Sequence, residues 1–513
     1  MRYAAAALAG LIGCGGGGHP EGPTDSDLGA FPNGGGCYPT YVDADQVEQF
    51  SFVNPEWAAV EEGTAIDSAP VLVHGTVEQF IVSRQDFPAS HLAYDAVPFL
   101  RLDEEDAWRL GTGNLTDEED GIMEIEWEAG AWPDWAWPGP GDRLAVMGRW
   151  IFDCGHPGGA PGTCSATTDR PCVIDDDCRP PRCPDCGADE TCAGEHFGYS
   201  TEIHPPHAAA SIRLGRGGQL VDGGPAQPVS RADIYVSADG GPAGDRCTLT
   251  HVDGLRDFLF SVECFPLDEP VAQVRARDFV FDLPLPPRPE GAGPAIWRVI
   301  EQAAPGGSAA ELQVSAHEDG AAPHLTVTVK TTGGGAAGPP TGFAGTLLAG
   351  WSDDATPLTH VRVTFTGVVV HDPLQPAVPV VREVHRWSMI AAVDGEWRQL
   401  PGLDEVTAAE QVIDTDVTID QFLPAGGALR VLADGAAYGC IDTMMGKSFA
   451  TDLTEMPLTD AVDCLQTSNP WPGTVDISYP GPDFGAGDHE TPSSGGDSAG
   501  GQAYSLRYRI ELP

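Results

Sequence analysis

Short segments in which apolar and polar residues alternate, separated by turns rich in glycine and proline, are the strongest constraint on the fold of this chain. The clearest segment runs from Asp142 to Cys154, where every second residue is apolar or small: Leu144, Val146, Gly148, Trp150, Phe152 and Cys154. A period of two is typical of a β-strand with one buried face. Helical periodicity is scarce, and Glu405 to Val412 is the best short helix. The chain is therefore expected to be mainly β.

Five strand-like segments before residue 206 predict a small barrel. They are Val71–Val77, Phe99–Leu102, Ile122–Trp127, Asp142–Cys154 and Ser200–His204. Pro205 and Pro206 should end the last strand, because proline cannot donate a hydrogen bond to a ladder. Five short strands with one long excursion suit a Greek-key barrel that resembles the OB fold, with a cysteine-rich insert at 157–198 on the loop between its last two strands.

The length of 513 residues exceeds what one hydrophobic core can serve, so several domains are expected. Evenly spaced short strands after the barrel predict two β-sandwich-like domains. The expected order is a signal with a lipidated cysteine at 1–14, a flexible Gly/Pro tether at 15–36, an OB-like domain at 37–215, and sandwich-like domains at 216–352 and 353–513.

The 13 cysteines predict disulfide bonds. Without Cys14, an even number of cysteines remains, as disulfide pairing requires. A zinc ribbon is the less favoured alternative, because it would need a second Cys-x-x-Cys besides Cys183 to Cys186. Six cysteines crowd into the insert, which has few apolar residues: Cys164, Cys172, Cys178, Cys183, Cys186 and Cys192. Outside it, the expected pairs are Cys247 with Cys264, Cys440 with Cys464, and, across a longer distance, Cys37 with Cys154.

The first fourteen residues look like an export signal. They are apolar from Ala4 to Gly13, too short for a membrane-spanning helix of roughly 20 residues, and they end in Leu11-Ile12-Gly13-Cys14. That tetrad resembles the lipobox of bacterial lipoproteins. The resemblance implies cleavage before Cys14, acylation of that residue with chains such as palmitate, and a membrane anchor on the cell envelope. Gly15, where some lipoproteins carry an aspartate that retains them at the inner membrane, favours the outer membrane.

The charge balance excludes one class of partner. The chain has 27 Lys and Arg against 76 Asp and Glu, a formal net charge of -49. Such a surface repels phosphate backbones, so nucleic-acid binding is not expected. Weak binding of divalent cations is compatible with it, and an envelope protein or a glycan is the expected kind of partner.

Histidines and carboxylates at predicted strand ends form the best candidate site. They are His91, Asp95, Asp153, His156, Glu202 and His204. Glu202 and His204 are two residues apart on an extended segment and point to the same side. Imidazole with carboxylate suits Zn²⁺ or another first-row ion. The alternative is a buried polar knot whose members satisfy one another.

The same segments carry a resemblance without an activity. Asp153-Cys154-Gly155-His156 and Glu202-Ile203-His204-Pro205-Pro206 resemble a pattern in uncharacterised bacterial exported proteins. This resemblance implies membership of that group and no chemistry.

A tryptophan-rich loop and a set of acidic turns each have two interpretations, one as a ligand-binding site and one as a structural element. Trp132, Trp135 and Trp137 could stack on sugar faces or fold back as a lid over the barrel. The acidic turns of the last domain could hold Ca²⁺, although aspartate is also simply a good turn residue: Asp372, Asp394, Asp414, Asp416 and Asp434.

Gly496-Asp497-Ser498-Ala499-Gly500 matches the nucleophile elbow of serine hydrolases in letters but not in context. An elbow needs a strand before it, a helix after it and a histidine later in the chain, and no histidine follows His489. No catalytic residue is assigned. The sequence therefore favours a lipid-anchored binding or structural module over an enzyme. The alternatives are a carbohydrate-binding surface protein and a metal-dependent hydrolase, with His156, Glu202 and His204 as ligands and Asp153 or Asp95 as ligand or base.

Overall fold

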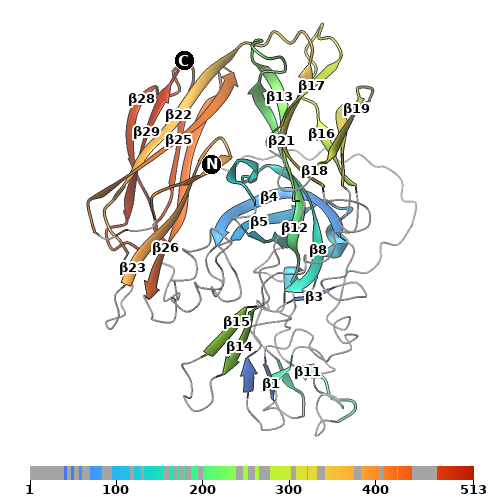
Figure 1. Cartoon of the computed structure of the whole chain (residues 1–513), viewed down its shortest axis with the longest axis vertical. Helices are drawn as coiled ribbons and strands as arrows, with labels where there is room; N and C mark the ends of the chain where they lie inside the picture. Colours follow the sequence, from blue (N-terminus) through green and yellow to red (C-terminus); the bar gives the residue numbers. More distant parts are fainter. Residues whose placement is uncertain are drawn as a thin grey trace.

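The structure is a computed structural model, and the regular elements among its described residues are β-strands and a few short 3-10 turns (Figure 1). It describes residues 40–42, 48–50, 57–59, 70–83, 95–111, 113–115, 121–128, 132–153, 162–166, 171–172, 178, 187–193, 200–237, 247–251, 260–264, 278–301, 308–320, 322–331, 341–374, 383–403, 406, 408–424, 426–441 and 471–513. Among these residues, no helix has the length and apolar character needed to cross a membrane. The expectation of a mainly β fold is confirmed.

Five strands form a closed ring of pairings. In ring order they are β4 (Val71–Ser83), β5 (Asp95–Leu102), β6 (Ile122–Ile125), β12 (Thr201–Gly218) and β8 (Arg143–Asp153), which returns to β4. All neighbours are antiparallel except β6 and β12, which are parallel. This is the Greek-key barrel of OB type that the alternation predicts, with the cysteine-rich insert between β8 and β12.

Strand β12 does not end at Pro205 and Pro206, so that prediction is wrong. The strand continues to Gly218. Its register with β8 shifts between Ile203 and Pro206 and again between Pro206 and Ala208. Such irregularities interrupt the ladder and can therefore hold a residue that has no N–H to donate.

The barrel shares β8 and β12 with the next unit. Beyond the prolines, β12 pairs with β13 (Gln227–Val236), which leads through β21 (Thr341–Trp351) to β17 (Ala295–Glu301). Val146 and Ala209 pack in the barrel core, whereas Met147 and Ala210 pack in the core of the second unit. Both faces of these two strands are thus buried, and β12 crosses the boundary expected at residue 215.

A three-stranded sheet covers the other side of that second core. Its order is β16 (Phe279–Pro284), β20 (His324–Lys330) and β19 (Glu311–His317). Phe279, Phe281, Leu325, Val327 and Val329 point inward, while the residues between them face outward. The two-residue strand β18 (Ser308–Ala309) pairs with β21 in parallel.

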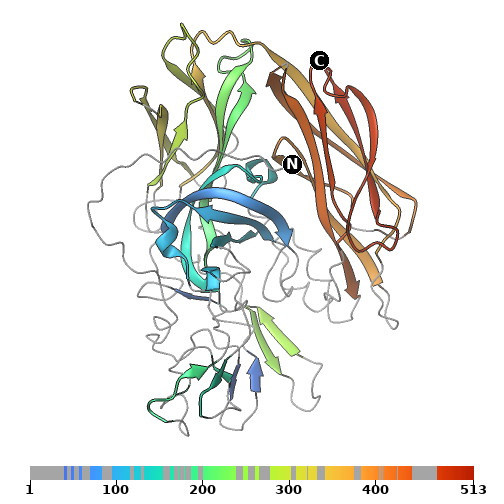
Figure 2. The same ribbon diagram turned by 180° about the vertical axis from the view of Figure 1, so that it is seen from behind.

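The C-terminal unit is a sandwich of two four-stranded sheets. One has the order β25 (Gln411–Pro424), β22 (Leu358–Val370), β29 (Tyr504–Glu511), β28 (Gly487–Pro492), and the other β24 (Glu396–Leu400), β23 (Glu383–Val393), β26 (Ala428–Ile441), β27 (Val475–Pro480). Asp394 and Gly395 have positive φ and form the turn between β23 and β24. Gln411 and Val412 lie in β25, so the helix expected up to Val412 is wrong. Figure 2 shows the long strands of this sandwich beside the barrel.

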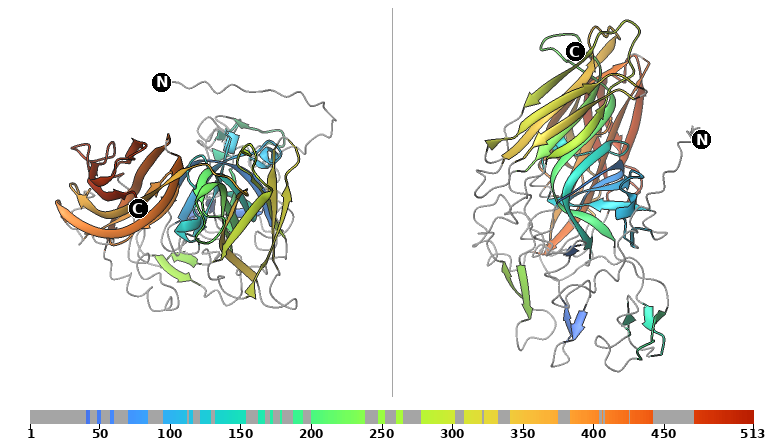
Figure 3. Two further views of the ribbon diagram at one scale, coloured as in Figure 1. Left: turned by 90° about the horizontal axis from the view of Figure 1, so that it is seen from above. Right: turned by 90° about the vertical axis from the view of Figure 1, so that its right-hand side faces the viewer.

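Short strands and turns complete the chain. They are β1 (Thr40–Val42), β2 (Glu48–Phe50), β3 (Trp57–Ala59), β7 (Trp127–Glu128), β9 (Gly162–Cys164), β10 (Pro171–Cys172), β11 (Cys192–Ala193), β14 (Cys247–His251) and β15 (Phe260–Cys264), with the 3-10 turns η2 (Ala107–Arg109), η3 (Gly113–Leu115) and η4 (Asp134–Ala136). The small sheets of β1–β2, β9–β11 and β14–β15 lie at the end of the molecule opposite the two sandwiches (Figure 3).

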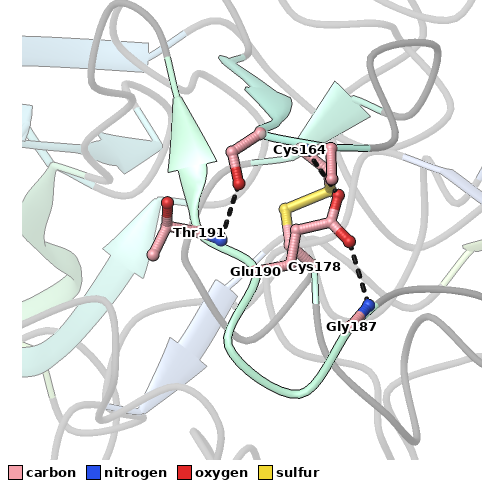
Figure 4. Close-up of a disulfide and its surroundings, with 7 residues drawn as sticks. Cys164, Cys178, Gly187, Glu190 and Thr191 are labelled. Atoms are coloured by element: carbon pink, nitrogen blue, oxygen red, sulfur yellow. Dashed lines mark hydrogen bonds between the residues drawn. A yellow bond between two sulfur atoms is a disulfide. The ribbon is translucent and has the colours of Figure 1, made fainter.

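One disulfide of the insert joins Cys164 to Cys178, and Glu190 lies beside it (Figure 4). The Glu190 carboxylate accepts hydrogen bonds from the backbone N–H groups of Ala166 (2.9 Å) and Gly187 (3.0 Å). The backbone positions of Cys247 and Cys264 are register partners in the hairpin β14–β15, as their expected pairing requires. For Cys172, Cys192 and Cys440 only the strand positions are described, and Cys14, Cys37, Cys154, Cys183, Cys186 and Cys464 lie outside the described residues.

Candidate metal centre on the barrel

Glu126, Glu202 and His204 converge on the outer face of the barrel. Ile125, Trp127 and Ile203 belong to the barrel core, so the residues between and beside them point the other way. The backbone N–H of Glu126 donates to the carbonyl of Ile203 at 3.2 Å, which holds the segment after β6 against β12. The parallel pairing of β6 and β12 thereby brings three ligand-type side chains together.

The distances within this cluster are short. His204 Nδ1 lies 2.9 Å from Glu126 Oε2 and 3.4 Å from Glu202 Oε1. One ligand atom from each residue lies within 4.8 Å of the other two. Glu202 and His204 are 2% and 3% exposed, and the Glu126 side chain is 12% exposed. An ion held here would have a single edge open to solvent, on the side of Glu126.

Electrostatics gives the cluster two states. Burial lowers the pKa of His204, but the carboxylates of Glu126 and Glu202 outweigh burial and raise it well above the usual 6.5. Without an ion, the imidazolium bonds to both carboxylates, which is the polar knot that the sequence allowed. With a divalent ion, the ring gives up its proton and the three residues supply one nitrogen and carboxylate oxygens, a donor set that fits Zn²⁺.

The structure brings together two of the six residues expected at this site. Asp153 ends β8 opposite Trp57, and Asp95 begins β5 opposite Ser83 and Glu128, but only their backbones are described. His91 and His156 lie outside the described residues. Glu126 was missed from the sequence alone. Two signals would have indicated it: Glu126 lies on the polar face of the segment Ile122–Trp127, and in an OB barrel this third strand pairs in parallel with the last strand.

A second group of metal-ligand type joins β4 to η2. One carboxylate oxygen of Asp106 accepts from the backbone N–H of His74 at 2.9 Å and lies 3.2 Å from its Nδ1. Burial lowers the pKa of His74, but its bond and charge interaction with Asp106 outweigh this, so the pKa is raised. The third member, Glu105, is exposed. We interpret this group as an ion pair that fixes the turn.

The tryptophans of the loop before β8 lie mostly inside the molecule. Trp132 is 0% and Trp137 1% exposed, and Trp137 Nε1 donates to the carbonyl of Trp132 at 2.7 Å. Both pack in the barrel core, and Trp135 packs against it from a partly buried position. Neither Trp132 nor Trp137 has a ring face open to solvent, so a sugar could not stack on them in this arrangement.

The acidic turns of the C-terminal unit do not gather at one end. Asp394 lies at the end where β25 passes into β26, whereas Asp372 and Asp414 lie at the opposite end, where β22 finishes and β25 begins. Asp434 accepts from the Trp471 indole at 3.0 Å. Asp416 faces the register shift of β22 near Phe365. The five aspartates are therefore not brought together at one end of the sandwich.

Serine residues of the same unit are held in structural bonds. Ser498 donates to Asp372 Oδ2 at 2.9 Å from a turn that no helix follows, in agreement with its rejection as a nucleophile elbow. Ser505 Oγ lies 2.8 Å from His371 Nε2, and the Nδ1 of the same histidine lies 3.3 Å from Glu410 Oε1. This connectivity matches a catalytic triad. Ser505 lies inside β29 and is 4% exposed, so a substrate could not reach it, and we assign it no catalytic role.

Comparison with known proteins adds little. No family model matches this chain, and no curated protein is similar to it. Among solved structures, a C2 domain protein from Ramazzottius varieornatus matches 31% of this chain and 91% of its own, with 13% identity. Its TM-score is 0.17, too low for any argument about fold or function. What the chain does has to be inferred from its own residues.

Proposed function

We propose that this protein is a lipid-anchored cell-envelope protein, carried on the outer membrane by Cys14, that acts as a binding or structural module. The lipobox-like Leu11-Ile12-Gly13-Cys14 supports the anchor. Support for a rigid module comes from a chain of buried and partly buried ion pairs that links all three β units. We call Asp142, Arg213, Asp233, Arg231 and Glu396 the central ion chain.

The first half of the central ion chain joins the barrel to the second unit. Arg213 of β12 donates to Asp142, just before β8, at 2.9 Å, and to Asp233 of β13. Arg213 and Asp233 are 2% and 0% exposed. Thr346 of β21 adds a hydrogen bond to Asp233 at 2.5 Å. A charge buried this deeply is tolerated only when it is paired, so these contacts fix the two units against each other.

The second half of the central ion chain reaches the C-terminal sandwich. Arg231 bonds to Asp233 at 3.0 Å and to Glu396 of β24 at 2.8 Å. Gln421 of β25 also donates to Glu396, at 2.9 Å. Next to this contact, the Phe80 ring of the barrel lies between the rings of Trp137 and Trp397, with centroid distances of 5.4 Å and 6.1 Å. Polar and apolar contacts together favour a single rigid body.

Within this module we assign Glu126, Glu202 and His204 to a divalent cation of the Zn²⁺ type. Glu202 and His204 are buried, and solvent reaches the group only beside Glu126, so a substrate would have little access to an ion held there. A hydrolase built on this centre is therefore the weaker proposal.

Metal analysis of the purified full-length protein tests the cation assignment. The wild-type chain should bind one equivalent of Zn²⁺ that Glu202→Gln loses. Glu490→Gln, an exposed carboxylate on β28, is the matched control and should keep the ion. Equal zinc content in wild type and Glu202→Gln would overturn the assignment and leave the polar knot.

Labelling cells with a radioactive or clickable palmitate tests the anchor separately. The wild-type chain should carry label and sediment with membranes, whereas Cys14→Ser should lack label and be released. Label that persists in Cys14→Ser would contradict the proposed attachment.

A further inference from the structure

The outer face of the sheet β16–β20–β19 places two histidines and an aspartate side by side. His317 ends β19, His324 begins β20, and these two residues are direct register partners. Asp282 of β16 is paired with Thr326, two residues along β20 from His324. On both β16 and β20 the alternate residues form the buried core, so Asp282, His324 and Thr326 share the solvent-facing side, and His317 is exposed.

Two hydrogen bonds leave one free ligand atom on His324 and one on Asp282. His324 Nδ1 lies 3.0 Å from the carbonyl of Ala322, which can only accept, so in the neutral ring Nδ1 carries the hydrogen and Nε2 the lone pair. Thr326 Oγ1 donates to Asp282 Oδ1 at 2.8 Å, which orients the carboxylate. Metal-binding histidines and carboxylates are commonly held by such outer hydrogen bonds.

The free atoms face each other at a distance that suits a shared ion. His324 Nε2 and Asp282 Oδ2 are 3.7 Å apart. Ligand atoms placed tetrahedrally at about 2.0–2.1 Å from zinc lie roughly 3.3 Å from one another. The gap is thus too long for a hydrogen bond and close to the separation of two ligands on one metal.

His317 supplies the second imidazole. Its ring stacks on that of His324, with centroids 4.8 Å apart and an interplanar angle of 23°. Among the described residues, these three are not a group whose ligand atoms already lie within 4.8 Å of one another, so the exposed ring of His317 has to rotate to bring a nitrogen to the same point. Two imidazoles and one carboxylate then converge from three adjacent strands.

From this geometry we infer that His317, His324 and Asp282 form a surface site for a first-row transition-metal ion. This site is separate from the barrel cluster and does not depend on the proposed function. Imidazole-rich sets favour Cu²⁺, Ni²⁺ and Zn²⁺, with Cu²⁺ the tightest, whereas Mg²⁺ and Ca²⁺ prefer oxygen-only sets. The negative field of the whole chain raises the local concentration of cations.

Isothermal titration of the full chain with Cu²⁺ and Ni²⁺ tests the inference. His317→Ala and His324→Ala should each weaken one equivalent by at least about tenfold, because removal of even an outer-shell partner typically costs 10- to 100-fold. Thr326→Val, which keeps both imidazoles and the fold of an exposed position, should weaken the same equivalent by a smaller factor. Electron paramagnetic resonance of the Cu²⁺ complex should show two bound nitrogens in the wild type and one in His317→Ala.

His360→Ala is the matched control, because His360 is another partly exposed strand histidine beside an aspartate, Asp420, at 2.7 Å. It should bind as the wild type does. Glu202→Gln should also leave this equivalent intact, which separates failure here from failure of the barrel site. Titrations of His317→Ala and His324→Ala that superimpose on those of the wild type would overturn the inference.

Discussion

The pairing of arginine with a carboxylate occurs in two settings in this molecule, the central ion chain and the outer strands of the C-terminal sandwich. In the central ion chain, Arg213 and Asp233 have side chains that are 1% and 0% exposed. On the sandwich, Arg430 and Asp476 form two hydrogen bonds of 2.9 Å and 2.8 Å, yet their side chains are 51% and 50% exposed. The bonding is comparable and the surroundings are opposite.

The difference shows that burial, more than bond geometry, decides what such a pair does. An exposed pair contributes about 0–1 kcal/mol, because water screens the charges and would solvate each of them separately. A buried pair is costly to form, but removal of one partner leaves an uncompensated charge in a poorly solvated place. The central ion chain therefore constrains how the units meet, while the surface pairs contribute little to stability.

The largest expected effect is that of Asp233→Ala. It removes the acceptor of Arg213, Arg231 and Thr346 at once. We expect a loss of about 3–5 kcal/mol in the free energy of unfolding, measured by urea denaturation of the full chain. Asp488→Ala, which breaks an exposed pair with Arg509, is the control and should lose far less stability, because water screens this pair. Equal losses in both variants would show that burial makes no difference here.

Acid should weaken the same chain at Glu396. Burial raises the pKa of this carboxyl, but Arg231 and Arg398 outweigh burial and lower it from 4.5 to about 2. A lowered pKa stabilises the folded state above pH 4.5, and this contribution is lost as the pH falls toward 2. The loss is about 3 kcal/mol, since one pKa unit corresponds to about 1.4 kcal/mol.

Chemical denaturation at a series of pH values measures this contribution. Glu396→Gln should be less stable than the wild type at pH 6, and the difference should shrink between pH 4.5 and 2. If the difference in the free energy of unfolding between the two proteins stayed constant over that range, protonation of Glu396 would not be coupled to folding.

His204 should respond to pH in the opposite sense. Its raised pKa means that the protonated ring stabilises the metal-free folded state below pH 6.5, and that this contribution is lost as the pH rises through the pKa in the folded state. We expect a smaller effect than at Glu396, because solvent reaches Glu126. Melting curves in a chelator above pH 6.5, compared between the wild type and Glu126→Gln, check this. A wild type that gains stability relative to Glu126→Gln as the pH rises above 6.5 would contradict it.

The smallest expected effect is that of the exposed pair Arg430–Asp476. A double-mutant cycle with Arg430→Ala and Asp476→Ala should give a coupling energy of about 0–1 kcal/mol, lower still in 0.5 M salt. A coupling above about 2 kcal/mol would remove the contrast with the central ion chain.

Local patterns predicted the parts of the fold that depend on neighbours in sequence. The alternation from Leu144 to Phe152 located β8. Asp394, named in the sequence as a turn residue, lies with Gly395 in the turn between β23 and β24, and an aspartate and a glycine accept the positive φ that this turn requires. Glu405–Val412 misled because its helical spacing covers a turn and the start of β25, where pairing with β22 decides the structure.

Contacts between distant segments could not be predicted in this way. Glu126 and His204 meet because β6 and β12 run parallel, a pairing that the expected OB topology implies but that no pattern next to either residue shows. The tryptophans are similar: Trp132 is buried against Trp127, with ring centroids 5.3 Å apart, a contact that depends on closure of the barrel. Glu202 and His204 were found because their shared side follows from spacing along one strand.

Strand β12 has a practical consequence for anyone who wishes to dissect this protein. Its eighteen residues supply side chains to the barrel core and to the core of the second unit. A truncation at residue 215 would therefore leave strands without their hydrogen-bonding partners in both fragments. Calorimetry should accordingly record the barrel and its neighbour melting as one cooperative event, and fragments that end between them should be recovered as aggregates.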